Sequence, residues 1–360
     1  MSADATANSR AGVLRVAEID WASLVAHLLG SGAEEAAALL CGTDGPDALV
    51  VREVIALSDE DYLDRGDLHL SIDPVFLARA AKRARTLGMT MVLAHSHPFA
   101  GSVLASALDR ATERDLCGRV IFARTERPVG ALVLGPDGFD GRLWSGNDVM
   151  ELERITVVGE RVQHLTGSSD GDASPGADED LEGRYARHAS IWGPEGQQLL
   201  RKSAVAIVGL GGTGSHVAQQ LGHLGIGRLT LLDDDAIDES NLSRVVGSTV
   251  GDVGTAKVEV ARRLVASINP EARVECLQLN VLDEALEHLR GCDVIVCATD
   301  SHGSRDLLNR VAKQYLVPVV DLGVEITRGD DAAARAGGGV RVLRPGSGCL
   351  LCSGSLDPEM

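Results

Sequence analysis

The residues best suited to metal chemistry lie in the first third of the chain. His95 and His97 stand in the run His-Ser-His-Pro at the end of a predicted strand, and Asp109 follows them. Two imidazoles and one carboxylate leave a fourth tetrahedral position for water, as a catalytic zinc ion requires. Glu35, in a segment with helical character, is a candidate base for that water. The pattern predicts a catalytic zinc site.

Each part of this pattern also has a simpler interpretation. Ser106 and Asp109 have the spacing of an ordinary helix capping box. A His-x-His pair is also common among polar strand residues, and a single helical glutamate such as Glu35 is most often solvated. The joint occurrence of all these residues in this order favours the metal site.

Together these residues resemble the motif of the JAMM/MPN (JAB) metallopeptidases. The resemblance implies that His95, His97 and Asp109 bind Zn²⁺, that Glu35 activates the water, and that Ser106 helps to hold the oxyanion. It also implies a JAB/MPN α/β domain with (iso)peptidase activity toward a ubiquitin-like protein. The gap between His97 and Ser106 is one residue longer than in the eukaryotic pattern.

A second group of residues is suited to phosphate binding. Gly209, Gly211, Gly212 and Gly214 lie in a turn between a predicted strand and a predicted helix, where bare backbone amides can approach a phosphate. Taken alone, this turn is compatible with NAD or with a purely structural role. Asp233 ends the next predicted strand and can accept hydrogen bonds from the ribose of either NAD or ATP.

The residues that follow favour ATP over NAD. Asn241, Arg244 and Lys257 supply an amide and two cations, which suit a triphosphate better than a dinucleotide. Asp300 follows a further predicted strand, in the crevice where parallel sheets bind ligands, and is placed to hold Mg²⁺. Lys257 alone would be an ordinary solvated helix charge, so the prediction depends on the whole set.

This array resembles the ThiF/MoeB/HesA family, which is related to ubiquitin-activating enzymes. The implied reaction is attack of a protein C-terminal carboxylate on the α-phosphate of ATP. The implied partner is a ubiquitin-like or sulfur-carrier-like protein ending in Gly-Gly. The resemblance implies ribose binding by Asp233, phosphate binding by Asn241, Arg244 and Lys257, magnesium binding by Asp300, and action in trans across a homodimer by Arg187.

The seven cysteines do not form an obvious disulfide framework. Only Cys349 and Cys352 have metal-ligand spacing, and they match the first half of a structural zinc site in the ThiF-type family. The second half would lie downstream, so we expect the adenylating domain to be C-terminally incomplete. The pair is then metal-free, exposed, or completed by another chain, with a second structural Zn²⁺ as the alternative. No catalytic cysteine is assigned.

Composition limits the class of partner. The chain has 360 residues, a formal charge of −18 and a 3% aromatic share. This charge repels nucleic acid and anionic membranes, and the low aromatic content leaves few surfaces for stacking bases. The N-terminal residues lack an apolar segment of signal-peptide type. We expect a cytoplasmic protein with a protein or small-molecule substrate.

The predicted elements place both sites in α/β domains. A helix should begin after Asp73, with Pro74 in its first turn, and end at Gly88. From Ser203 onward, strands and helices alternate as in a parallel, Rossmann-like sheet. The expected division is a JAMM/MPN domain over 11–146, a helix (roughly 148–165) and flexible acidic linker over 147–183, and a ThiF-like domain over 184–360.

Several functions fit this organisation. The leading prediction is a bifunctional enzyme that processes and adenylates a ubiquitin-like protein. A second alternative is adenylation of a small-molecule, peptide or RNA-borne group, and a third is a non-catalytic scaffold. An NAD-dependent oxidoreductase is disfavoured by Arg244 and Lys257 near the expected phosphates.

Overall fold

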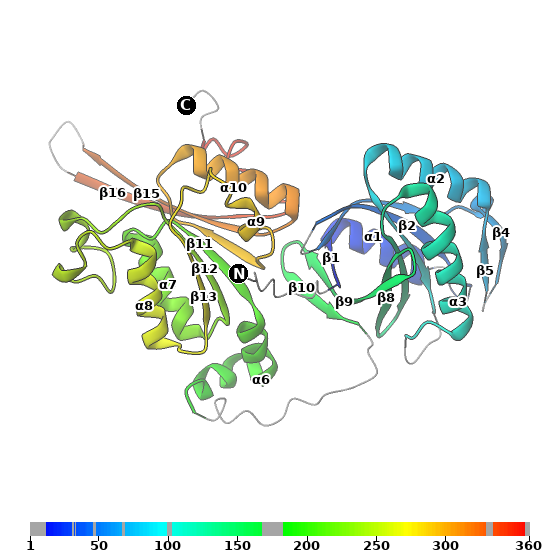
Figure 1. Cartoon of the computed structure of the whole chain (residues 1–360), viewed down its shortest axis with the longest axis horizontal. Coiled ribbons are helices and arrows are strands. Elements are labelled where there is room, and N and C mark those ends of the chain that lie inside the picture. Colours follow the sequence, from blue (N-terminus) through cyan, green and yellow to red (C-terminus); the bar gives the residue numbers. More distant parts are fainter. Residues whose placement is uncertain are drawn as a thin grey trace, which may run out of the picture. The chain divides into compact units, whose positions relative to one another are not determined.

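The computed structural model describes residues 12–30, 32, 34–45, 48–66, 69–98, 103–167, 183–328 and 334–356. The chain divides into two compact units, Met1–Asp172 and Ala173–Met360, and each is α/β (Figure 1). No described helix is both long enough and apolar enough to span a bilayer.

The first unit is built on an eight-stranded sheet in the order β1-β3-β2-β6-β7-β8-β9-β10. An additional parallel pairing of β1 with β9 curls this sheet back on itself. Its strands are β1 (Gly12–Ala17), β2 (Ala37–Asp44), β3 (Leu49–Ala56), β6 (Thr90–Ser96), β7 (Val129–Gly135), β8 (Gly138–Ser145), β9 (Asp148–Val158) and β10 (Val162–Thr166). A separate hairpin pairs β4 (Tyr62–Arg65) with β5 (Leu70–Ile72).

Helices cover both faces of this sheet. They are α1 (Glu18–Leu29), α2 (Pro74–Leu87), α3 (Ala107–Asp115) and α4 (Phe122–Thr125), with a π-helical stretch, Leu116–Ile121, between the last two. Along β2, Ala38 and Leu40 join the core that contains α1, whereas Leu39 and Cys41 join the core that contains α2. Because side chains alternate across a strand, a strand buried on both faces is continuously apolar.

The structure confirms one predicted helix and corrects two others. The Asp73 carboxylate accepts a hydrogen bond from the Val75 amide at the start of α2, and Gly88 ends the helix with φ 65°. Glu35, predicted to be helical, instead lies in the extended segment that enters β2. The helix predicted over 148–165 is also wrong, since β9 and β10 occupy that region.

These corrections move the end of the first domain. Because β9 and β10 belong to the first sheet, that sheet continues beyond the predicted boundary at 146. The flexible acidic linker predicted within 147–183 lies largely at 168–182, outside the described residues.

The second unit contains a six-stranded sheet in the order β13-β12-β11-β14-β15-β16. The first five strands are parallel and β16 is antiparallel, which confirms the predicted Rossmann-like arrangement. Its strands are β11 (Ala204–Val208), β12 (Arg228–Leu232), β13 (Arg273–Leu277), β14 (Val294–Cys297), β15 (Val319–Arg328) and β16 (Ala334–Leu343). Its helices are α6 (Ala186–Lys202), α7 (Gly212–Leu224), α8 (Lys257–Ile268), α9 (Leu286–Leu289) and α10 (His302–Tyr315).

Side-chain alternation again divides the core between two faces. In β11, Val205 and Ile207 pack with α7 and α8, whereas Ala206 and Val208 pack with α9 and α10. The strand order reverses between β11 and β14, which creates a crevice at their carboxyl ends. The fold therefore predicts a ligand site at the end of β11.

Candidate functional sites

Two paired strands and one helix position the candidate metal site of the first unit. His95 lies in β6 opposite Ala37 of β2, so the segment before β2 runs beside the segment that carries His97. The buried Ser96 hydroxyl accepts a hydrogen bond from the Ala36 amide at 2.9 Å, which ties the two segments together. Asp109 comes from the first turn of α3.

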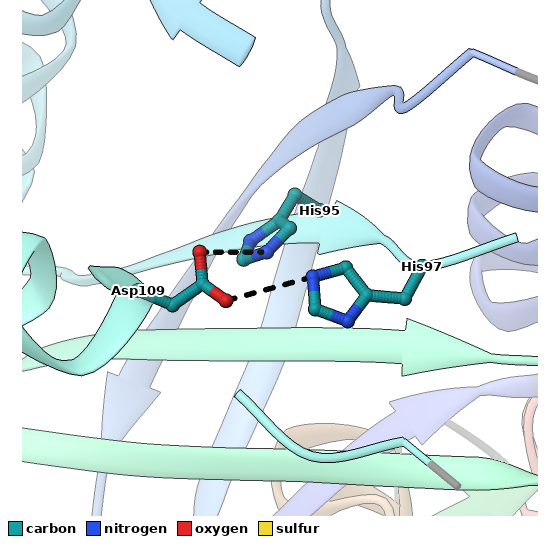
Figure 2. A group of neighbouring side chains, drawn as sticks. All are labelled: His95, His97 and Asp109. Atoms are coloured by element: carbon teal, nitrogen blue, oxygen red, sulfur yellow. Dashed lines mark ion pairs between the residues drawn. The ribbon is translucent and has the colours of Figure 1, made fainter. Parts of the chain in front are cut away.

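The side chains of His95, His97 and Asp109 converge (Figure 2). Asp109 Oδ1 lies 3.9 Å from His95 Nε2, and Asp109 Oδ2 lies 3.6 Å from His97 Nε2. Two atoms that share a tetrahedral zinc ion at about 2.0 Å are about 3.3 Å apart, close to these separations. Glu35 Oε1 lies 3.9 Å from His97 Nε2, beside the triad. The structure thus brings the predicted ligands and the predicted base into one place.

The surroundings favour the protonation states that a metal site needs. Burial lowers the pKa of His95 to about 4, so its imidazole is neutral at physiological pH. Burial opposes ionisation of Asp109, but hydrogen bonds from Ser106 and the nearby histidines lower the pKa of Asp109 overall. A neutral imidazole and an ionised carboxylate are the forms that bind metals.

The pKa of Glu35 is raised, whereas that of the neighbouring carboxylate Asp109 is lowered. Burial is the main cause that raises the pKa of Glu35 to about 7, and the charge of Asp109 adds to it. The Glu35 side chain is also nearly enclosed. A carboxylate with such a pKa is suited to accept and return a proton near neutral pH.

Ser106 and Asp109 form the capping box that was the simpler interpretation of their spacing. The Ser106 amide donates to Asp109 Oδ2 at 2.7 Å, and the Asp109 amide donates to Ser106 Oγ at 3.1 Å. The same Asp109 carboxylate faces both histidines. The capping box and a metal site are therefore compatible, because the cap orients the ligand.

The second unit has a cleft of ≈ 1450 Å³ at the carboxyl ends of its parallel strands. It gathers most residues predicted to bind the nucleotide. These are Gly209, Gly211, Gly212, Asp233, Asn241, Arg244, Lys257 and Asp300. Gly214 does not line the cleft; a Cβ on it would lie 1.8 Å from the Gly209 carbonyl oxygen, so this glycine permits close packing of α7.

The acidic residues after β12 organise the glycine turn and Lys257. Asp233 is buried, and its carboxylate accepts hydrogen bonds from the amides of Leu210 at 2.6 Å and Asp235 at 3.0 Å. Lys257 Nζ lies 2.6 Å from Asp235 Oδ2 and 3.6 Å from Asp233 Oδ1. Asp235 is exposed and still pairs with Lys257, so a surface carboxylate also helps to hold this cation.

A second ion pair of the cleft was missed by the sequence analysis. Arg305 Nε and Nη2 donate to the two carboxylate oxygens of Asp321, at 2.9 and 2.5 Å. Asp321 lies in β15 opposite Cys297, and both members of the pair line the cleft. The sequence offered one signal for this pair, because Asp321 is a carboxylate inside an apolar run, Val-Pro-Val-Val-Asp-Leu-Gly.

Two predicted features lie apart from the cleft. Arg187 is exposed on α6 and does not line it. Cys349 and Cys352 have their sulfurs 3.1 Å apart, and hydrogen bonds from Cys352 lower the pKa of Cys349 to about 7. Within the described part of the chain, no further His, Cys, Asp or Glu completes a metal-binding group with these cysteines. Zinc at this pair stays a prediction.

A parallel sheet with a glycine turn and a cation-lined cleft at its switch point defines a nucleotide-binding α/β domain. Residues 185–360 match the model of the ThiF family, and this part of the chain is a ThiF-family domain.

Curated relatives match the chain over part of their length. The SAMP-activating enzyme E1 of Haloferax volcanii is 41% identical over 141 residues, which are 38% of this chain and 52% of that protein. The sulfur carrier protein adenylyltransferase of Thermus thermophilus is 40% identical, over 36% of this chain and 48% of that protein. The tRNA threonylcarbamoyladenosine dehydratase of Bacillus subtilis is 34% identical, over 33% and 47% respectively. The chain spans about half the length of these relatives.

Among solved structures, E. coli MccB with AMPCPP and MccA is 29% identical. The match covers 50% of this chain and 54% of that chain, with a TM-score of 0.41.

Proposed function

We propose that the second unit uses ATP and Mg²⁺ to adenylate the C-terminal carboxylate of a ubiquitin-like or sulfur-carrier-like protein. One observation carries this proposal: the glycine turn, Asn241, Arg244 and Lys257 converge in a single cleft at the switch point of a parallel sheet. Relatives described as SAMP-activating and sulfur-carrier-adenylating enzymes support the choice of substrate.

The proposed chemistry needs positioning and charge neutralisation more than a covalent group on the protein. Amides at the start of α7 and the cations Arg244 and Lys257 would bind the phosphates. Asp233 would bind the ribose, and Asp300 would hold Mg²⁺. A carboxylate oxygen of the protein tail attacks the α-phosphorus, and the bond to the bridging oxygen breaks as pyrophosphate leaves. Arg187 would act in trans within a homodimer.

ATP–pyrophosphate exchange tests this function directly. The wild type should exchange label only when a protein ending in Gly-Gly is present, and Asp300→Ala should abolish the exchange. Asp306→Ala is the matched control, because Asp306 pairs with Arg310 on the surface of α10 and does not line the cleft. Exchange without any protein tail would contradict the proposed substrate and favour a small-molecule carboxylate.

For the first unit we propose a zinc-dependent isopeptidase or peptidase that acts on the same kind of tail, as in the JAMM/MPN resemblance. The observation that favours it is the convergence of His95, His97 and Asp109 with Glu35 beside them. The three ligands would hold Zn²⁺, which polarises a carbonyl and acidifies water. Glu35 would take the proton from the attacking water and pass it to the leaving amine, and Ser106 would donate to the oxyanion.

Zinc content tests this second proposal. The purified chain should bind one equivalent of Zn²⁺ at this site, and His97→Ala should lose it. Retention of the same zinc content by His97→Ala would refute the assignment.

Other substrates for the ThiF-family domain are less well supported. The similarity to a tRNA threonylcarbamoyladenosine dehydratase points to an RNA-borne group as an alternative substrate. The charge of −18 opposes RNA binding, since it repels the phosphate backbone. The exchange assay also addresses a non-catalytic scaffold, which would give no exchange with any tail.

A further inference from the structure

A buried ion network lies between α3 and β8 in the first unit. Arg142 of β8 donates from Nε and Nη2 to the two carboxylate oxygens of Glu113 in α3, at 2.7 and 3.0 Å. Its Nη1 donates to Asp140 Oδ1 at 2.7 Å. Arg142, Glu113 and Asp140 are only 3%, 6% and 7% exposed. The guanidinium therefore makes three charge-assisted hydrogen bonds away from bulk solvent.

This network holds the chain on both sides of Asp109. Glu113 lies one helical turn after Asp109, on the same face of α3. Asp140 Oδ2 accepts a hydrogen bond at 2.8 Å from the amide of Ala105, the residue before the capping box. Arg142 therefore anchors the helix through Glu113 and the entry to the helix through Asp140.

Stability alone does not explain why charged residues, Arg142, Glu113 and Asp140, hold α3 in place. Burying charges costs desolvation energy, and apolar residues of similar size often hold a helix equally well. A guanidinium that donates to carboxylates from both of its edges also fixes the orientation of those carboxylates, because its planar N–H groups form good hydrogen bonds in few geometries. A metal site needs such control, since its ligands must be held to within about 0.5 Å.

We propose that Arg142 is a positioning residue for the metal site of the first unit. Through Glu113 and Asp140 it sets where the Asp109 carboxylate lies relative to His95 and His97. This inference rests on the proposed zinc function. It predicts that Arg142 controls zinc affinity and ligand geometry as well as the stability of the fold.

Two substitutions in the full chain test this role. Arg142→Lys keeps the charge but removes the fork, and the double substitution Arg142→Met with Glu113→Leu replaces the pair by apolar side chains. Removal of groups that orient metal ligands typically weakens binding about 10–100-fold, and we expect that range for both. Zinc affinity is measured by competition with a chromophoric chelator, and ligand geometry by the visible absorption of bound Co²⁺. Thermal unfolding of the metal-free chains monitors the fold.

The matched control is Arg83→Lys. Arg83 binds both carboxylate oxygens of Glu53 and so links α2 to β3 in the same unit, but it takes no part in the network around Asp109. The zinc affinity of Arg83→Lys should stay within about twofold of wild type, since loss of the Arg83–Glu53 pair disturbs no metal ligand.

The outcomes separate this inference from the function on which it rests. A wild type that binds no zinc would refute the zinc function and the positioning role with it. Wild-type zinc affinity and Co²⁺ spectra in folded Arg142 variants would refute the positioning role alone. Failure of both variants to fold, even with excess Zn²⁺, would show that the network is purely structural and would also overturn the inference.

Discussion

At the scale of single residues, the surroundings of Glu35 differ from those of an ordinary solvated glutamate. Glu35 is buried, it lies 3.9 Å from His97, and its pKa is raised to about 7. It contacts no described backbone donor that would make it a structural cap. These features suit a proton acceptor beside the metal ligands.

We predict that Glu35→Gln retains zinc but lowers the rate of Gly-Gly isopeptide cleavage about 10²–10⁴-fold, because an amide cannot take a proton from water. Cleavage rate and zinc content are measured on the same sample. Glu34→Gln is the control, since the half-exposed Glu34 pairs with Arg65. Equal losses of zinc and activity in Glu35→Gln would instead make Glu35 a ligand.

At the scale of elements, the glycine turn before α7 contains two glycines, Gly211 and Gly214, that differ in the space available for a side chain. A Cβ on Gly214 would collide with the Gly209 carbonyl oxygen at 1.8 Å, whereas a Cβ on Gly211 would meet nothing within 4 Å. We predict that Gly214→Ala lowers the free energy of unfolding of the second unit by about 1–3 kcal/mol through overpacking. Gly211→Ala should keep the stability of the nucleotide-free domain.

The same pair separates packing from phosphate binding. Gly211→Ala should reduce the thermal shift produced by ATP and Mg²⁺, because its methyl group would occupy the approach to the helix amides. Thermal unfolding with and without nucleotide measures both effects. A Gly214→Ala protein as stable as wild type would contradict the packing role.

Elements with clear end signals could be predicted from the sequence, and those without them could not. For α2, the Asp73 cap, the first-turn proline and Gly88 agree, and the helix forms as expected. The segment after Glu35 is rich in alanine and leucine, and such a run fits a helix or a doubly buried strand equally well. Pairing with β3 and β6 decides the matter, and this pairing involves residues far away in the chain.

The residues of the candidate sites stand out in the sequence more clearly than the elements that carry them. Zinc and phosphate chemistry limits the residue types, so His95, His97, Asp109 and Lys257 stand out even where the local structure is misjudged. Residues that only hold or orient a site residue do not belong to such a motif. Arg142 and Asp235 emerged only from their contacts with Glu113 and Lys257.

At the scale of the whole molecule, each compact unit carries its own candidate site. We predict that Zn²⁺ and ATP–Mg²⁺ stabilise different thermal transitions, each by about 2.7 kcal/mol at a free concentration about 100 times Kd. Differential scanning calorimetry resolves the two transitions. His97→Ala should remove the zinc effect and leave the ATP effect intact. One transition shifted by both ligands would mean that the two units unfold together.

The contact between Lys257 and Asp235 bears on which anions can enter the cleft. Asp235 is held beside Lys257 by the chain, so its carboxylate competes with any free anion for the Lys257 ammonium group at a high effective concentration. Free sulfate or inorganic phosphate offers few further contacts and competes poorly, whereas ATP also brings its ribose, its base and its bound cation. If the domain adenylates a protein tail as proposed, the Asp235 carboxylate would pair with Lys257 again as pyrophosphate leaves. Under the proposed function, this ion pair would discriminate against small anions and would favour product release.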